Sequence, residues 1–159
     1  MFRSIRFKLV LISLLLVSLV TVSTLFIVMG IMDRIILDQV MKRGIAVANS
    51  ASTSAAYSIL SDDRLALDNL TIRTKDMWED ILNVTAVDNN GIIVAHNDLT
   101  RIGTIYEKND GVVVRRIDGA TVQRVTSEDK EKYEISMPIR FSSKFLGSIH
   151  IDMSTGSID

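Results

Sequence analysis

The sequence lacks cysteine altogether and has little proline, histidine or aromatic character. Without cysteine, the chain can form no disulfide, thiolate metal site, lipid-modified cysteine or c-type haem attachment. With only two histidines, His96 and His150, it offers little for a transition-metal cluster. We therefore expect neither a metal site nor a cofactor.

Acidic residues are absent from the first 32 positions, and this absence coincides with a long apolar run. Leu9 to Met32 gives 24 residues without a charge. At about 1.5 Å per residue, a helix of that length crosses the roughly 30 Å hydrocarbon core of a bilayer. A helix is also the only single segment that pairs all its backbone groups internally in hydrocarbon. We therefore predict a transmembrane helix over residues 9–32.

A cleaved signal peptide is the main alternative for this run. The apolar region of such a peptide is normally about 7–15 residues and leads directly to small residues at the cleavage site. Here the run is longer and ends at Asp33-Arg34, and the nearest A-x-A pattern, residues 46–48, lies beyond several charges. We favour an uncleaved anchor.

The charges on either side of the run predict an orientation. Arg3, Arg6 and Lys8 precede it without any acid, so the positive-inside rule places residues 1–8 in the cytoplasm. The rest would lie outside the plasma (inner) membrane, as a periplasmic or extracellular domain. That part carries fifteen basic and nineteen acidic residues, a balance that argues against a nucleic-acid partner.

Two helices are predicted after the apolar run. Residues 33–60 contain no proline and repeat apolar positions at helical spacing, so the membrane helix should continue through them. Ser61-Asp62-Asp63 breaks the pattern with capping chemistry, and a second helix is expected over 63–78. Residues 44–56 are rich in small side chains, which allow close packing on the domain's own sheet or on a second copy of the helix. Both interpretations stay open, because no strict heptad is sustained.

From residue 81 the pattern changes to strands. Asn90-Gly91 and Asp118-Gly119 each lie between aliphatic runs, which is the strongest short-range signal for a hairpin. A polar connection, residues 97–111, separates the two hairpins. Helices come first and a five- to six-stranded antiparallel sheet follows over 81–153, so the predicted fold class is α+β.

The last two strands alternate apolar and polar residues. Pairing Ile135 with Ile149, and Tyr133 with Ile151, puts both apolar sets on one face. In this register Glu134 lies opposite His150 on the other face, with Asp152 nearby. We interpret these three as a solvated face or a polar patch under a helix. The sequence contains no nucleophile elbow, phosphate loop or metal-spaced carboxylates, so we expect no enzyme activity from these residues.

At this point the chain resembles the extracytoplasmic PAS-like sensor domains called Cache. The segment AVDNNGIIVAHNDLTRIG has an aliphatic strand, D-x-x-G, an apolar strand ending in a small residue and His, and a later Ile-Gly. The final segment YEISMPIRFSSKFLGSIHIDMS has a strand ending in Pro-Ile, a turn and a Gly-aliphatic strand. The resemblance covers residues 33–157 and implies a single Cache domain preceded by its first transmembrane helix.

The resemblance implies a function. Cache domains are input modules of bacterial chemoreceptors, sensor histidine kinases and nucleotide cyclases, where they bind small molecules against the sheet and signal as dimers. We therefore expect a membrane-anchored, homodimeric sensor that transmits to a cytoplasmic output domain, with this chain as an excerpt of a longer receptor. The alternative is a non-sensory membrane-anchored interaction or dimerisation module.

Ligand-binding candidates are side chains near the sheet and its long connection. Arginines can hold a carboxylate through a bidentate fork, aromatic residues can wall a pocket, and a histidine ends the second strand. Each type also has a plainer role as a surface charge or a core residue. The candidates are Arg73, Trp78, His96, Arg101, Tyr106, Arg115 and Tyr133. The expected ligand is a small molecule such as a carboxylate or an amino acid.

Overall fold

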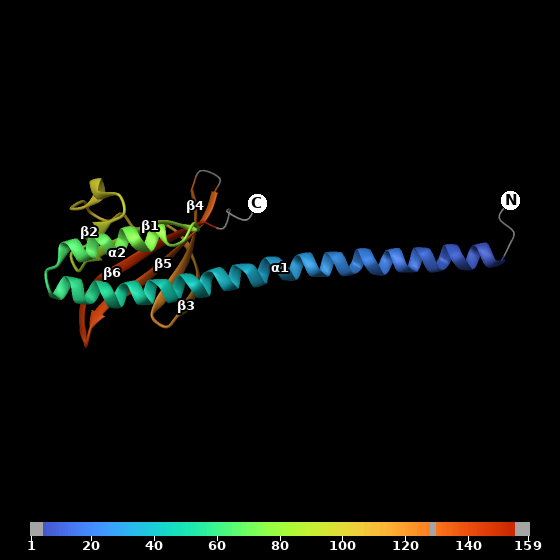
Figure 1. Cartoon of the computed structure of the whole chain (residues 1–159), viewed down its shortest axis with the longest axis horizontal. Helices are drawn as coiled ribbons and strands as arrows, with labels where there is room; N and C mark the ends of the chain where they lie inside the picture. Colours follow the sequence, from blue (N-terminus) through green and yellow to red (C-terminus); the bar gives the residue numbers. More distant parts are fainter. Residues whose placement is uncertain (1–4, 128–129, 155–159) are drawn as a thin grey trace. The chain divides into compact units, whose positions relative to one another are not determined.

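The computed structural model describes residues 5–127 and 130–154, and they divide into two compact units, Met1–Val40 and Met41–Asp159. Figure 1 shows the helices and strands. The elements in chain order are α1 (Ile5–Leu60), α2 (Arg64–Asp76), β1 (Ile81–Asp88), β2 (Ile93–His96), η1 (Leu99–Arg101), β3 (Val112–Ile117), β4 (Ala120–Ser127), β5 (Lys130–Phe141) and β6 (Lys144–Ser154).

The first unit contains the N-terminal part of α1. Its stretch Phe7–Val28 is long and apolar enough to cross a membrane, judged by length and composition. Apolar side chains point outward on every side of this stretch, from Leu9 to Val28, so it has no amphipathic stripe. The predicted anchor, residues 9–32, overlaps it.

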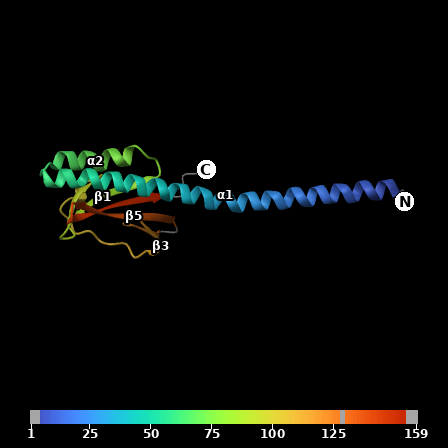
Figure 2. The ribbon, with the colours of Figure 1, turned by 90° about the horizontal axis from the view of Figure 1, so that it is seen from below.

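The second unit is built on a six-stranded antiparallel sheet with the strand order β2-β1-β6-β5-β4-β3. Helix α2 packs on β1 and β2. The part of α1 after Met41 covers β5 and β6, where a Cβ atom on Gly44 would meet the side chains of Ile135 and Met153. Figure 2 shows both helices on the same side of the sheet. The predicted α+β fold, with helices before an antiparallel sheet, is confirmed.

Small side chains bring α1 close to the sheet. Ala48 and Ala55 are fully buried, and Ala51 and Ala56 nearly so. Larger side chains at these positions would hold the helix away from the strands. The small-residue stretch therefore packs on the domain's own sheet, and pairing with a second copy stays a prediction.

The break between the helices has the predicted capping chemistry. The carboxylate of Asp63 accepts a hydrogen bond from the backbone N–H of Ala66 at 2.9 Å, which satisfies a free donor at the start of α2. Asp62 has a φ of 52°, the left-handed conformation that turns the chain between the helices.

The two predicted hairpin turns form with different geometry. Asp118 and Gly119 both have positive φ, as a type I′ turn requires. In the β1–β2 turn only Gly91 has positive φ. There the Asp88 carboxylate closes the turn by accepting hydrogen bonds from the backbone N–H groups of Asn90 and Ile92, at 2.8 and 2.9 Å.

The predicted register of the last two strands is wrong by two residues. Ile135 pairs with Ile151, and Glu134 therefore lies opposite Asp152 rather than His150. A shift of two residues leaves every side chain on its own face, so the apolar pattern cannot detect it. The pairing depends instead on the tight β5–β6 turn and on an irregularity that follows Ile139.

Candidate functional site

The sheet face opposite the helices carries polar side chains in two rows that cross the strands. Side chains alternate between the faces of a strand, so the neighbours of the apolar residues in β5 and β6 point to this side. The first row contains His96, Thr85, His150, Ser136 and Thr121. The second contains Asn83, Asp152, Glu134 and Gln123. We call these nine residues the polar face.

Residues 97–111, between β2 and β3, lie over the polar face, and we call them the covering segment. Figure 2 shows this connection on the side of the sheet away from the helices. Backbone hydrogen bonds fix it to the first hairpin: the N–H of Gly103 donates to the carbonyl of Ile93, and that of Tyr106 to the carbonyl of Gly91, both at 2.8 Å. The segment therefore places its side chains against the sheet.

Glu134 is fully buried at the centre of a hydrogen-bond cluster. Its Oε1 accepts from the hydroxyls of Tyr106 at 2.9 Å and Ser136 at 3.2 Å, and lies 2.9 Å from Nδ1 of His150. Its Oε2 accepts from the side-chain amide of Asn109 at 2.9 Å. The carboxylate thus has partners both from the sheet and from the covering segment.

These partners decide the charge of Glu134. Burial alone would raise the pKa of Glu134, but the hydrogen bonds from His150, Asn109 and Tyr106 outweigh it and hold the pKa at about 2. The group is therefore a buried carboxylate at neutral pH. Burial and the adjacent Glu134 charge raise the pKa of Tyr106 far above its usual value, so its hydroxyl stays a donor.

His150 contacts both Glu134, at the centre of the cluster, and Ser148, two residues before it in β6. Its ring lies against that of Tyr106, with the ring centroids 4.3 Å apart and the planes tilted by 32°. Its Nε2 is 2.9 Å from the hydroxyl of Ser148, while Nδ1 faces Glu134. Both ring nitrogens are thus engaged, and the imidazole is fixed in orientation.

His96 contrasts with His150, because one of its nitrogens has no partner. The side chain is 2% exposed. Its Nδ1 accepts a hydrogen bond from the backbone N–H of Asp98 at 2.7 Å, so the neutral ring carries its proton on Nε2. Among the described residues, Nε2 has no hydrogen-bond partner. A buried donor in this state favours the binding of an acceptor atom.

The protonation of His96 follows from its surroundings. Burial lowers the pKa of His96, and the positive charge of Arg101 lowers it further. The ring is therefore neutral near pH 7. A ligand oxygen would meet a neutral N–H donor there, and an ionised carboxylate in the second row.

An ion pair marks the part of the polar face next to Glu134. Lys132 Nζ lies 3.3 Å from a carboxylate oxygen of Asp152, which also accepts from Asn83 at 3.4 Å. The face therefore combines donors, acceptors and both signs of charge. Within residues 5–127 and 130–154, no group of three His, Asp or Glu side chains is arranged to hold a metal ion.

Three of the seven predicted ligand-binding residues lie at this site. His96 ends β2 in the first row, Arg101 belongs to η1 in the covering segment, and Tyr106 reaches Glu134. His96 and Arg101 come from the segment that carries the D-x-x-G and Ile-Gly pattern, and Tyr106 follows it by three residues. Their role in binding a ligand stays a prediction.

The other four lie away from the polar face. Arg73 is exposed on α2. Trp78, between α2 and β1, packs against the guanidinium of Arg43 in α1, 4.9 Å from the ring centroid. Arg115 and Tyr133 pair with residues on the helix side of the sheet, Val122 and Met153. The structure therefore does not bring the seven candidates together.

The sequence interpretation missed Glu134, His150 and Asn109. It placed Glu134 and His150 on a solvated face or under a helix, and this was wrong, because both are buried and the covering segment lies over them. The available signal was the alternation of polar residues with aliphatic ones in two long neighbouring strands. Nothing local in residues 97–111 indicates which face of the sheet they cover.

Comparisons with known proteins agree on this architecture. The family model described as "Putative sugar diacid recognition" matches residues 71–159, more than half of the chain. No curated protein matches the sequence. The sensor domain of E. coli DcuS is similar in structure, with 18% identity and a TM-score of 0.57 over 74% of this chain and 90% of that one.

A second solved structure of a sensor domain is also similar to this chain. The sensor domain of the V. cholerae histidine kinase DctB matches with 14% identity and a TM-score of 0.50, over 71% of this chain. The match covers 46% of the DctB chain, so this chain spans about half of that sensor domain. At these identities the likeness concerns the fold, and the predicted Cache-like sensor-domain fold is confirmed.

Proposed function

Because the chain belongs to the family described as "Putative sugar diacid recognition", we propose that it is the ligand-sensing input module of a bacterial receptor. A small molecule binds on the polar face, beneath the covering segment. The observation that carries this proposal is the buried Nε2–H of His96, which has no partner among the described residues and lies in the row next to that of ionised Glu134.

The two rows indicate the chemistry of the ligand. His96 offers a neutral N–H donor for a ligand carboxylate. Glu134 offers an ionised acceptor for a ligand hydroxyl or ammonium group, which would replace the hydrogen bonds from Tyr106 and Asn109. The ligand is therefore a small organic acid that also carries hydrogen-bond donors. Amino acids and sugar diacids both have this combination.

The membrane part of the proposal depends on α1. Its stretch Phe7–Val28 has the length and composition of a membrane span, and the basic residues before it favour a cytoplasmic N-terminus. We propose that residues 9–32 anchor the protein in the inner membrane and that residues 33–157 lie on the periplasmic or extracellular side. One helix contains both the span and the residues packed on the sheet, which supports transmission along α1, within a homodimer, to a cytoplasmic output domain.

Ligand binding by the full chain in detergent micelles tests the sensory proposal. Thermal unfolding would be followed with malate, galactarate, alanine and glutamate as probes. At a hundredfold excess over Kd, a bound acid should raise the free energy of unfolding by about 2.7 kcal/mol. Such a gain from any of these acids supports the proposal, and no gain from any of them overturns it.

Variants locate the binding. His96→Asn keeps a side-chain acceptor for the N–H of Asp98 but removes the donor at Nε2, and should weaken binding about tenfold, or about 1.4 kcal/mol. Ser50→Ala, at an exposed position of α1, is the matched control. Equal affinity in the His96 and Ser50 variants would place the ligand elsewhere and contradict the proposed site.

The exposed side of β3 supports a second candidate function, an interaction module. β3 forms one edge of the sheet, and its apolar residues Val112, Val113, Val114 and Ile117 are exposed. An apolar edge strand is a surface that can pair with another chain. Concentration-dependent association of the full chain that Val113→Lys abolishes, without any ligand response, would favour this candidate.

A further inference from the structure

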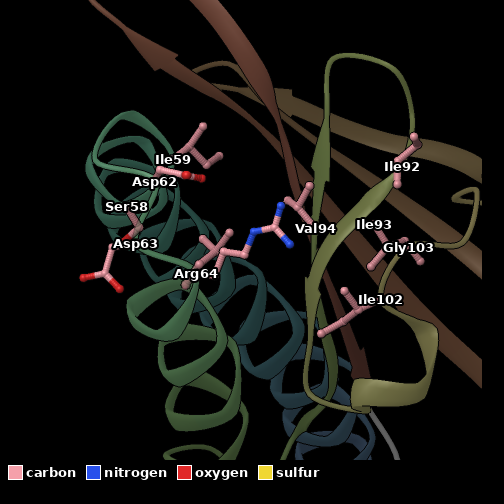
Figure 3. A pocket seen from close by; sticks show the side chains of 11 residues that line it. Ser58, Ile59, Asp62, Asp63, Arg64, Ile92, Ile93, Val94, Ile102 and Gly103 are labelled. Atoms are coloured by element: carbon pink, nitrogen blue, oxygen red, sulfur yellow. The ribbon is translucent and has the colours of Figure 1, made fainter.

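A separate cavity of about 240 Å³ lies between the turn joining the two helices and strand β2 (Figure 3). The helical turn, Ser58 to Arg64, lines one side, and residues 92–94 and Ile102 line the other. None of the nine polar-face residues lines it. We call it the turn cavity.

The walls of the turn cavity are mostly apolar. Ile59 and Leu67 line the helix side, and Ile93, Val94 and Ile102 the sheet side. Leu67 and Ile93 are buried core residues, which gives the cavity a rigid floor. Apolar walls of this kind favour an occupant with a hydrocarbon body.

One cation reaches into this apolar space. Figure 3 shows the guanidinium of Arg64, the first residue of α2, extended from the helix towards Val94 on β2. Within the described part of the chain, no hydrogen bond or ion pair involves this guanidinium. Arg64 is an exposed residue, so its N–H donors lie at the open side of the cavity, without a protein acceptor among the described residues.

The neighbouring acids do not neutralise Arg64. The Asp63 carboxylate is engaged in capping α2 through the backbone N–H of Ala66. In Figure 3 the Asp63 side chain points away from the cavity. Asp62 also lines the cavity but forms no ion pair with Arg64. Its charge opposes an anion and should reduce the affinity for one.

We propose that the turn cavity is a second binding site, which takes a small monocarboxylate with an apolar body. The carboxylate pairs with the guanidinium fork of Arg64, a geometry that favours two parallel hydrogen bonds. The carbon skeleton packs against Ile59, Leu67 and Val94. The cavity is smaller than the roughly 300–1,000 Å³ of sites for drug-sized ligands, so the ligand is a short branched or aromatic acid.

This site is independent of the one on the polar face, and the two can be tested separately. Isothermal titration of the full chain in detergent would use isovalerate and phenylacetate as probes, with isovaleramide and phenylacetamide as neutral controls of the same shape. The acids should bind at least tenfold more tightly than the amides. Equal binding of acid and amide, or no binding of either acid, overturns the proposal.

Two arginine variants on the same helix locate the charge. Arg64→Gln should weaken binding of the acids at least tenfold. Arg73→Gln removes the same charge from an exposed position of α2 that does not line the cavity, and should leave binding unchanged. Equal effects of the two variants would contradict a specific role for Arg64. Circular dichroism checks that both variants are folded.

A third variant should strengthen the binding of the acids instead of weakening it. Asp62→Asn removes the opposing charge, and asparagine tolerates the positive φ of this position. The acids should then bind two- to fivefold more tightly. Weaker or unchanged binding would mean that the Asp62 charge does not oppose the bound carboxylate, which contradicts its placement beside Arg64. Binding that persists in His96→Asn separates this site from the polar face, whereas loss in that variant contradicts a second site.

Discussion

Both faces of the sheet contain fully buried side chains, but different interactions hold them in place. On the helix side, Ile135, Ile149 and Ile151 have no exposed surface and pack against other apolar groups. On the polar face, Glu134 is buried to the same extent but depends on directional hydrogen bonds. Apolar contact is additive and tolerant of direction, whereas a buried carboxylate is stable only while its partners are in place.

The contacts of the two faces also come from different kinds of element. The partners of the helix side come from long elements, the helices α1 and α2 and the strands themselves. Two partners of Glu134, Tyr106 and Asn109, come from a connection that contains only one short helical turn. Connections of this kind open at lower free energy than helices and strands, so a ligand can exchange with their contacts.

The largest expected effect is on the helix side. Ile135→Ala should lower the free energy of unfolding by about 4 kcal/mol, because a fully buried isoleucine leaves a cavity that the strand and the backbone of Gly44 cannot fill. Chemical denaturation of the full chain in detergent at pH 7 measures it, and Ile135→Val, expected to lose about 1 kcal/mol, is the matched control. Ligand affinity at the polar face should not change. A parallel loss of affinity would show that the two faces are not independent.

Glu134→Gln should lower the free energy of unfolding by about 3 kcal/mol, because the amide NH₂ would face donors and leave a buried group unsatisfied. Glu131→Gln, an exposed position of the same strand, should change it by less than about 0.5 kcal/mol. Denaturation of the two variants side by side gives the difference. Equal free energies of unfolding for the two variants would mean that the hydrogen bonds to Glu134 add little to stability. The polar face would then not depend on directional hydrogen bonds as proposed.

The fold was more predictable from the sequence than this site. The α+β order, the capping by Asp63 and the Asp118-Gly119 turn depend on local patterns, and local patterns are visible in one sequence. The position of Glu134 depends on the β5–β6 register and on the covering segment, both set by contacts distant in sequence. A shift of two residues preserves the apolar alternation, so the pattern could place Glu134 on a face but not beside its partners.

The hydrogen bond from the Tyr106 hydroxyl to Glu134 should contribute less to stability than the whole set of hydrogen bonds to Glu134. Tyr106→Phe removes one donor to Glu134 and should lower the free energy of unfolding by about 1.5 kcal/mol at pH 7. Because the Glu134 pKa is lowered when folded, its contribution is present above the unfolded value of 4.5 and lost as the pH falls towards 2. The gap between variant and wild type should therefore narrow as the pH falls below 4.5. A gap that stays constant with pH would indicate lost packing instead.

The smallest expected effect is the pH dependence caused by His96. Its pKa in the folded protein is lowered below 6.5, so the unfolded chain binds more protons as the pH falls through 6.5. Its contribution to stability is therefore complete above pH 6.5 and is lost as the pH falls below that value. Denaturation at several pH values should show this slope in the wild type and a flatter one in His96→Asn. A bound carboxylate that accepts from Nε2 should also flatten the wild-type slope, because its negative charge favours the protonated ring and raises the His96 pKa in the folded state. Equal slopes in the wild type and the variant without ligand would mean that folding does not lower the His96 pKa.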